Sequence, residues 1–309
     1  YGLGTENANL PAFVAMVSQG TGKNPGQPVF SRLWGSGFLP SSHQGVGLRP
    51  GANPVLYLQN PPTVDGEQRR ALLDDLADLN EERAKEIGDP ETITRIKAYE
   101  MAFRMQTSVP DLTDISQESR ETLAAYGPEV TRPGSYAANC LLARRLVERG
   151  VRHTLLLHGV QIGKDSWDDH GNVKDGMIKH SREVDLPVAG LLADLKRRGL
   201  LDETLVVWAS EMGRTSFVNG AVGDNVGRDH NGHALCMWMA GGNVKGGATV
   251  GATADYSLCA ADEPSPIRDV HATLLNLLGL DDENLTYHYA GRIRRLTDIR
   301  ANVLKQMIA

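Results

Sequence analysis

The sequence predicts an α/β fold, because apolar runs of strand length alternate with amphipathic helical segments in its second half. The runs at 151–158, 204–209 and 235–240 each have the pattern of a strand. One helical segment separates the first two runs, and another follows the third. The run at 204–209 is apolar on both faces, which is typical of a central strand rather than an edge strand. The order strand, helix, strand, strand, helix indicates a layered α/β domain.

Both helical segments have recognisable ends. Gly199 follows the first segment and Gly279 the second, as left-handed caps require. Ser265 and Pro266 stand in the order favoured for an N-cap and a first helical turn. The apolar faces consist of Val184, Val188, Leu191, Leu192 and Leu195 in the first segment and of Ile267, Val270, Leu274, Leu277 and Leu278 in the second.

The chain divides into three parts by composition. Residues 1–66 are rich in Gly, Pro, Asn and Ser, and we expect a loop-rich N-terminal part of the sheet domain with strands at 13–17 and 54–58. Residues 67–150 predict a helical insertion or cap, and residues 151–309 the α/β core with the candidate site.

Two or more helices are expected within the helical part. Ala98, Met101, Ala102 and Met105 recur at helical spacing, and Leu72, Leu76 and Leu79 do so in the preceding segment. Asp89-Pro90 separates these two segments, since proline breaks a helix. A further helix near 135–149 is expected to end at Gly150 in a left-handed cap.

Composition narrows the function classes. The 309 residues carry a net charge of −6 and no basic block, which argues against nucleic-acid binding. No apolar run is long enough to cross a bilayer. Cys140, Cys236 and Cys259 form no CxxC pair, and we expect free thiols.

Three short polar clusters concentrate the coordinating side chains of the chain. They are 167–171, 210–215 and 227–233, and each follows an apolar strand-like run or lies in the loop beyond one. In open α/β sheets ligands bind outside the carboxyl ends of the strands, so these loops meet at the favoured edge. The clusters contain carboxylates and imidazoles but no thiols, which favours a Zn, Mn or related divalent ion, with Ca or Mg as alternatives, over a structural zinc finger.

The candidate metal ligands differ in strength. Asp229 and His233 are weaker candidates, and the sequence leaves open whether they bind metal, support the ligands or brace the loop. His158 closes the first strand-like run and fits a structural histidine better than a ligand. Arg214 and Arg228 flank the clusters and are candidates for binding a tetrahedral anion. The strongest candidate ligands are Asp168, His170, Glu211 and His230.

Several longer motifs extend this pattern over most of the chain. Together they resemble the sulfatase-like domain-of-unknown-function family 1501, which is similar to the alkaline-phosphatase superfamily of phosphatases, sulfatases and phosphomutases. The motifs that carry the resemblance are 101–110, 140–146, 167–171, 211–215, 227–231, 238–242 and 289–292.

The resemblance implies a three-layer α/β/α sandwich with a mixed, mostly parallel sheet. It implies a divalent-metal site in which Asp168 and His170 form one ligand pair, Glu211 supplies a further carboxylate and His230 the later histidine. It also implies a periplasmic or extracellular location, because members of the family commonly carry an export signal.

Two departures from the superfamily pattern bear on activity. The resemblance implies that a first strand, with a metal-binding Asp and the nucleophile, precedes the segment that resembles 1–7, so we expect that strand to be missing here. Residues Leu142, Trp238 and Ala261 stand two positions after the three cysteines, so no Cys-x-Pro-x-Arg motif for formylglycine is present.

These observations support two functions of different classes. The first is a metal-dependent hydrolase of phosphate or sulfate esters, with a small-molecule or glycan ester as substrate. The second is a non-catalytic binding or scaffold protein with a sulfatase-like fold that lacks the nucleophile segment. A third expectation is that the chain is part of a longer protein, whose N-terminal segment is its partner.

Overall fold

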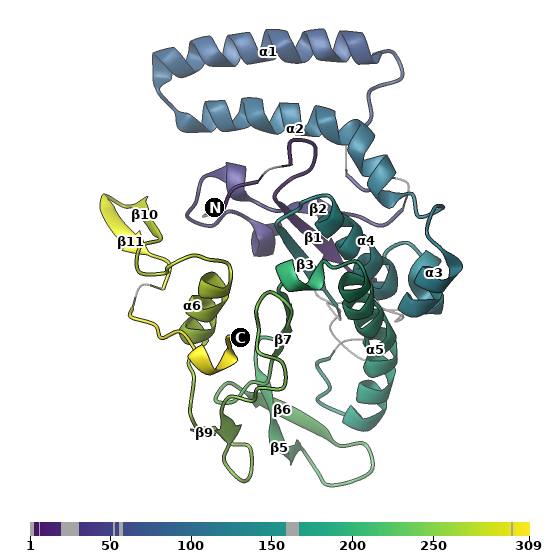
Figure 1. Ribbon diagram of the computed structural model, residues 1–309, viewed down its shortest axis with the longest axis vertical. Coiled ribbons are helices and arrows are strands. Elements are labelled where there is room, and N and C mark those ends of the chain that lie inside the picture. Colours follow the sequence, from purple (N-terminus) through teal and green to yellow (C-terminus); the bar gives the residue numbers. More distant parts are fainter. Residues whose placement is uncertain are drawn as a thin grey trace.

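A three-stranded parallel sheet lies at the centre of the molecule (Figure 1). The computed structural model describes residues 3–5, 7–19, 31–51, 53–55, 58–158, 167–297 and 299–309. The sheet has the order β2-β1-β3, with β1 at Phe13–Val17, β2 at Val46–Leu48 and β3 at His153–Leu157. β1 pairs with β3 in register from Phe13 and His153 to Val17 and Leu157.

The predicted strand at 13–17 is confirmed, whereas the sheet takes its other N-terminal strand from a different segment. Of the predicted strand at 54–58, Leu56 and Tyr57 lie outside the described residues, and Pro54, Val55 and Leu58 are not in a strand. Val55 and Leu58 instead pack against the core. β2 carries only three residues, Val-Gly-Leu, and so short a run gives no periodic signal.

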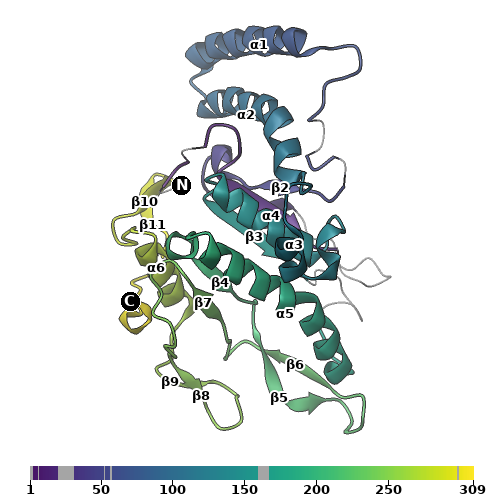
Figure 2. The same ribbon diagram turned by 45° about the vertical axis from the view of Figure 1, so that its right-hand side comes forward.

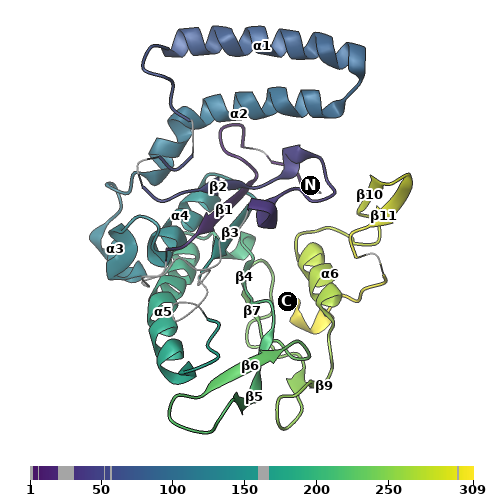
Figure 3. The ribbon, with the colours of Figure 1, turned by 180° about the vertical axis from the view of Figure 1, so that it is seen from behind.

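Two long helices form a hairpin that projects from one end of the molecule (Figures 1 and 3). α1 spans Gly66–Ile87 and α2 spans Pro90–Thr113, so the predicted break at Asp89-Pro90 is confirmed. Asp89 caps α2 by accepting a hydrogen bond from the Glu91 amide, and Pro90 occupies the first turn, where its missing N–H costs nothing. The carboxyl-terminal half of α2 enters the core through Met105, Val109 and Leu112.

Three further helices pack against one another, and one of them, α4, contacts β3 of the sheet. α3 spans Arg120–Tyr126, α4 spans Tyr136–Glu148 and α5 spans Val173–Arg197. Gly150 and Gly199, predicted as caps, have left-handed φ angles of 74° and 70°. α4 and α5 share a buried cluster that contains Leu141, Leu191 and Leu195, and Leu156 of β3 and Val206 pack against it.

Antiparallel strand pairs follow in the second half (Figure 2). β4 at Val206–Trp208 pairs with β7 at Trp238–Ala240, and β5 at Gly213–Asn219 pairs with β6 at Gly227–Asn231. The remaining elements are β8 at Ala252–Thr253, β9 at Ala260–Asp262, α6 at Ile267–Leu277, β10 at Thr286–Tyr289, β11 at Arg292–Arg295 and 3-10 turns at Ser31–Trp34, Ser41–His43, Pro128–Thr131, Leu201–Glu203 and Lys305–Met307.

Two sequence predictions in this half need correction. The strand at 204–209 exists as β4, but among the described residues it pairs on one side only, and Val207 is 40% exposed. Ser265 was expected to cap α6, yet Pro266 occupies the N-cap and Ser265 Oγ donates to the Glu263 carbonyl. The apolar composition of the run at 204–209 indicates that the strand is buried in a sheet. It does not indicate in which direction the neighbouring strand runs.

The fold is therefore a mixed α/β arrangement, as predicted. Within the described residues it has six α-helices, one small parallel sheet and four antiparallel pairs. No helix in this part of the chain is long and apolar enough to cross a membrane. Cys140 is buried, Cys236 and Cys259 are exposed, and all three are free thiols, as expected.

Candidate metal centre

The carboxylate of Asp168 is the centre of a cluster built from two of the three predicted polar segments. Its Oδ1 atom lies 3.0 Å from His170 Nε2 and 2.8 Å from His230 Nε2. The two imidazole Nε2 atoms are 3.2 Å apart. One oxygen and two nitrogen ligand atoms thus converge within 4.8 Å of one another.

The β5–β6 hairpin delivers the later histidine to this cluster. Arg214 of β5 stands opposite His230 of β6, and a bulge lies between Arg214 and Val218. Gly227 packs against the backbone of His170, where an added Cβ would lie 2.0 Å from the His170 carbonyl carbon. Gly171 also bridges Val226. Glycine at 227 therefore allows the two loops to approach closely enough for the imidazoles to meet.

Hydrogen bonds keep Asp168 ionised. The bond from His230 is the main cause, with burial acting against it and Arg214 adding to it, and the pKa of Asp168 falls to about 2. Arg214 Nη2 lies 2.7 Å from the same Oδ1 atom and also donates to the Trp167 carbonyl. The ionised form is the protonation state in which the Asp168 carboxylate can bind a divalent cation.

The outer nitrogen of His170 is held by the protein. Asn219 Nδ2 lies 3.0 Å from Nδ1 of His170, and Asp229 Oδ1 lies 3.7 Å from the same atom. Asn219 Nδ2 is a hydrogen-bond donor, so Nδ1 of His170 accepts this bond and the contact fixes the orientation of the ring. Asp229 thus lies behind a candidate ligand, as a residue in one of the three roles that the sequence left open would do.

The two arginines are placed differently. Arg214 is committed to Asp168, the Trp167 carbonyl and the Arg228 carbonyl. Arg228 is exposed, and its Nη1 donates to the Thr215 carbonyl at 3.3 Å. Among the described residues no acidic side chain forms an ion pair with Arg228. Arg228 is therefore the better placed of the two to meet an anion.

The remaining candidate ligands lie outside the three-residue cluster. Glu211 is exposed and lines the same cavity as Asp168 and His230, but it is not among the converging ligand atoms. His233 is exposed, and its backbone bonds to Asn231 and Ala260.

Both ring nitrogens of His158 are engaged within the protein. Nδ1 accepts a hydrogen bond of 2.8 Å from Trp167 Nε1, so the proton resides on Nε2, which lies 3.0 Å from Glu183. Trp167 is the neighbour of Asp168, so the Glu183–His158–Trp167 chain holds the segment that carries the central carboxylate. Two residues that support the cluster, Asn219 and Glu183, were not predicted from the sequence. Neither lies in one of the three polar clusters, and each is far in the sequence from the histidine that it contacts.

The donor set fits a divalent metal ion. Two ligand atoms bound tetrahedrally to zinc at about 2.0–2.1 Å are about 3.3 Å apart. The nitrogen–nitrogen distance of 3.2 Å matches this, and the nitrogen–oxygen distances of 3.0 and 2.8 Å are slightly shorter. Two histidines and one carboxylate leave at least one coordination position open, as in catalytic rather than structural zinc sites.

Comparison with known proteins gives one match. The family model described as "Protein of unknown function (DUF1501)" matches residues 1–308. Neither the curated proteins nor the solved structures contain a significant match. Because the match runs over nearly the whole length, the chain belongs to the DUF1501 family.

Proposed function

We propose that Asp168, His170 and His230 bind one divalent metal ion, zinc or manganese, at the active site of a phosphate or sulfate ester hydrolase. The observation that carries the proposal is the convergence of three candidate ligand atoms. The distances between these atoms are close to the distances between neighbouring ligand atoms in a metal coordination shell. When bound, such an ion polarises an ester oxygen and lowers the pKa of a bound water.

The neighbouring residues supply the other functions of such a site. Arg228 is exposed beside the cluster and suits an oxygen of a tetrahedral anion, which a guanidinium can bind with two hydrogen bonds. Arg214 holds Asp168 in place and compensates its charge. Glu211 lines the cavity next to the cluster and is a candidate for an additional ligand once a metal or substrate draws it in.

The proposal extends the family assignment toward the sulfatase-like and alkaline-phosphatase group. The resemblance of the sequence motifs supports this relationship, a three-layer sandwich and a periplasmic or extracellular location. A small-molecule or glycan ester is the proposed substrate class.

Metal titration tests the proposal directly. The chain is stripped with a chelator and titrated with Zn²⁺ and with Mn²⁺ by calorimetry. We expect one ion per chain, and we expect His230→Ala and Asp168→Asn each to weaken binding by more than about 100-fold, since even supporting residues account for 10–100-fold. His233→Ala is the matched control, because its imidazole is exposed and lies outside the cluster. Absence of stoichiometric metal, or equal losses in His230→Ala and His233→Ala, would falsify the proposal.

A second experiment separates hydrolysis from binding. The metal-loaded protein is assayed with p-nitrophenyl phosphate and p-nitrophenyl sulfate, and Arg228→Ala is expected to raise KM more than it lowers kcat, because Arg228 would bind the anion in both ground and transition states. Tight metal binding without turnover would favour the non-catalytic function. Among the residues that the structure describes, no strand pairs with the outer edge of β3 or of β4, which favours that second candidate because the sheet beside the cluster is then incomplete.

A further inference from the structure

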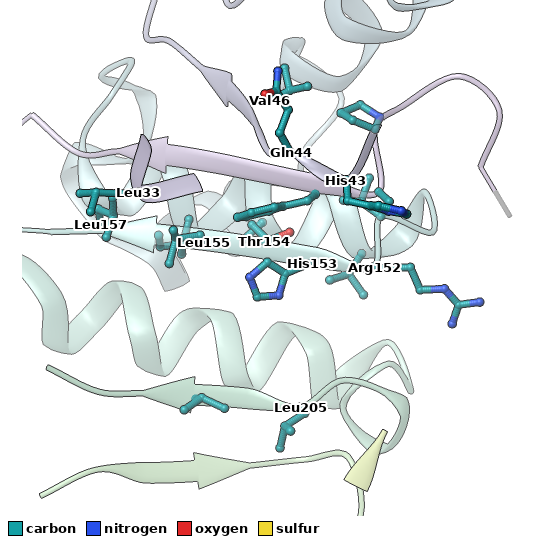
Figure 4. A pocket seen from close by; sticks show the side chains of 18 of the residues that line it. Leu33, His43, Gln44, Val46, Arg152, His153, Thr154, Leu155, Leu157 and Leu205 are labelled. Atoms are coloured by element: carbon teal, nitrogen blue, oxygen red, sulfur yellow. The ribbon is translucent and has the colours of Figure 1, made fainter. Parts of the chain in front are cut away.

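Three of the four tryptophans of the chain line one cavity, which has a volume of about 2420 Å³. Where the cavity extends between β3 and β4, its lining includes Leu155, Leu157 and Leu205 (Figure 4). Asp168 and His230 of the candidate metal centre line the same cavity. Its aromatic part is a tryptophan wall, which consists of Trp167, Trp208 and Trp238. One cavity therefore joins this wall to the candidate metal centre.

The tryptophan wall runs from an exposed ring to the residue next to Asp168. Trp238 is the first residue of β7 and pairs across the strands with Trp208, the last residue of β4. The planes of these two rings differ by only 7°, and the ring centroids are 6.1 Å apart. Trp208 in turn meets Trp167 edge to face, at an interplanar angle of 85° and a centroid distance of 6.4 Å. Because Trp167 directly precedes Asp168, the wall leads toward the candidate metal centre.

The exposure of the tryptophan wall distinguishes it from a packed core cluster. Trp238 is 36% exposed, although tryptophan is highly buried on average in folded proteins. Met177 of α5 lines the same cavity and is also exposed. Sites for small molecules are typically concave, and they are lined by aromatic and apolar side chains with a few polar groups that fix orientation. The wall therefore has the features of a binding site.

The polar groups beside the wall suit a ring that carries hydroxyl groups. Within the part of the chain that the structure describes, the indole N–H groups of Trp208 and Trp238 have no hydrogen-bond acceptor. Ser210 Oγ donates to the Met212 carbonyl, so its lone pairs remain available to accept a hydrogen bond. A pyranose ring has C–H bonds on its faces and hydroxyl groups around its rim, so it can contact the indole faces and pair with these polar groups. An aryl group would leave the same donors without partners.

We propose that the tryptophan wall binds a pyranose ring, and that the substrate is a sugar that carries a phosphate or sulfate ester beside this ring. Trp208 and Trp238 contact the ring, Ser210 accepts a hydrogen bond from a hydroxyl group, and the ester group extends past Trp167 toward Asp168. The position of the ester rests on the proposed function, whereas binding of the ring does not. Of the two substrate classes, small molecules and glycans, the wall selects the glycan ester.

NMR of the indole N–H groups tests the binding of the ring. The ¹⁵N-labelled protein is titrated, with a chelator present, with the methyl pyranosides of glucose, galactose, mannose and N-acetylglucosamine, which carry neither an ester nor an aryl group. The four tryptophans give four indole signals, which Trp→Phe variants assign. We expect the Trp208 and Trp238 signals to shift with at least one pyranoside. The Trp34 signal should stay unchanged, because Trp34 is not among the cavity residues.

Substitution of Trp238 gives the second measurement. Trp238→Ala is expected to weaken pyranoside binding at least about tenfold, because it removes the most exposed ring of the wall. Trp238→Phe keeps an aromatic face and loses only the N–H donor, so its loss should be smaller. Trp34→Phe is the matched control and should bind as the parent does.

Three results would overturn the proposal. They are the absence of shifts with all four pyranosides, equal pyranoside affinity of Trp238→Ala and the parent, and shifts that only phenyl sulfate causes, which would assign the wall to aryl groups. The chelator keeps this test independent of the metal proposal. Stoichiometric zinc binding without pyranoside shifts would leave the proposed function standing, and pyranoside binding without zinc binding would leave only the sugar site.

Discussion

At the scale of single residues, the candidate site depends on how closely two backbone segments approach. The imidazoles of His170 and His230 meet because Gly227 allows β6 to lie against the His170 backbone. Asn219 then fixes the ring of His170 from behind. The geometry of the cluster thus depends on a glycine and an amide as much as on the three candidate ligands.

Gly227→Ala is expected to separate the two histidines. The new Cβ would stand 2.0 Å from a backbone carbon of His170, so one segment must move, at a cost of about 1–3 kcal/mol. We expect a lower unfolding temperature and at least a tenfold loss of zinc affinity. Gly223→Ala is the control, because its Cβ has no neighbour within 4 Å. Equal behaviour of the two variants in calorimetric titration and thermal unfolding would show that the close approach does not matter.

At the scale of elements, local signals in the sequence were sufficient where an element carries its own pattern. The apolar run at 13–17 gives β1, and Asp89-Pro90 marks the start of α2. β2 was not predicted, because a run of three residues is too short to show a periodic pattern. The antiparallel direction of β7 relative to β4 was not predicted either, since the apolar composition of a strand is the same in either direction.

The candidate site was predictable as a set of residues but not as a geometry. Asp168, His170 and His230 stood out as polar groups after strand-like runs. Their convergence depends on the strand register that places Arg214 opposite His230. A long glycine-rich loop sets this register, and amino-acid composition does not predict it. For the same reason the sequence did not separate Glu211 from the cluster or assign Asn219 to it.

Of the long helices, α1 in the helical hairpin is expected to be the least stable. α1 has a single buried residue, Leu73, whereas α4 has nine buried residues. α1 is held to α2 by a salt bridge of Arg70 with Glu100 and by Arg70 above the Phe103 ring. Such partly exposed contacts contribute little free energy, so we expect α1 to open while the core stays folded.

Native-state hydrogen exchange measures this difference. We expect the α1 amides to exchange at least about 100-fold faster than those of α4, which corresponds to about 2.7 kcal/mol less protection. Arg70→Ala should speed exchange in α1 and leave α4 unchanged. Uniform protection of both helices would show instead that the hairpin unfolds together with the core.

At the scale of the whole molecule, a buried ionic network connects the segments that cover the sheet. Arg144 has a side chain only 2% exposed and lies 2.7 Å from Glu118 and 2.9 Å from Asp194. Arg145 also pairs with Glu118. The network joins α4 to α5 and to the loop before α3. Removing one partner leaves an uncompensated buried charge, which costs far more than losing a surface ion pair.

This network predicts how the whole fold responds to acid. Burial opposes ionisation of Glu118, but hydrogen bonds from Arg144 and Arg145 outweigh it and hold its pKa below the usual 4.5. Arg197 and Arg198 likewise outweigh burial and hold the pKa of Asp194 below 3.8. The folded state therefore binds fewer protons than the unfolded state, so stability is full above about pH 5 and falls as the pH drops through 4.5 and 3.8.

Thermal unfolding of Glu118→Gln between pH 3 and pH 7 tests the network. The variant should lose about 3–5 kcal/mol at pH 7, or roughly 5–15 °C in Tm, because Arg144 and Arg145 lose a buried partner. Its Tm should also decline less steeply below pH 4.5 than that of the parent, since one of the groups that take up protons on unfolding is gone. Glu129→Gln is the matched control, because Glu129 pairs with Arg132 at the surface with a side chain 55% exposed, and its loss should stay below about 1 kcal/mol. If Glu118→Gln kept the parent's stability at pH 7 and its full acid dependence, the network would contribute no more to the free energy of unfolding than a surface ion pair does.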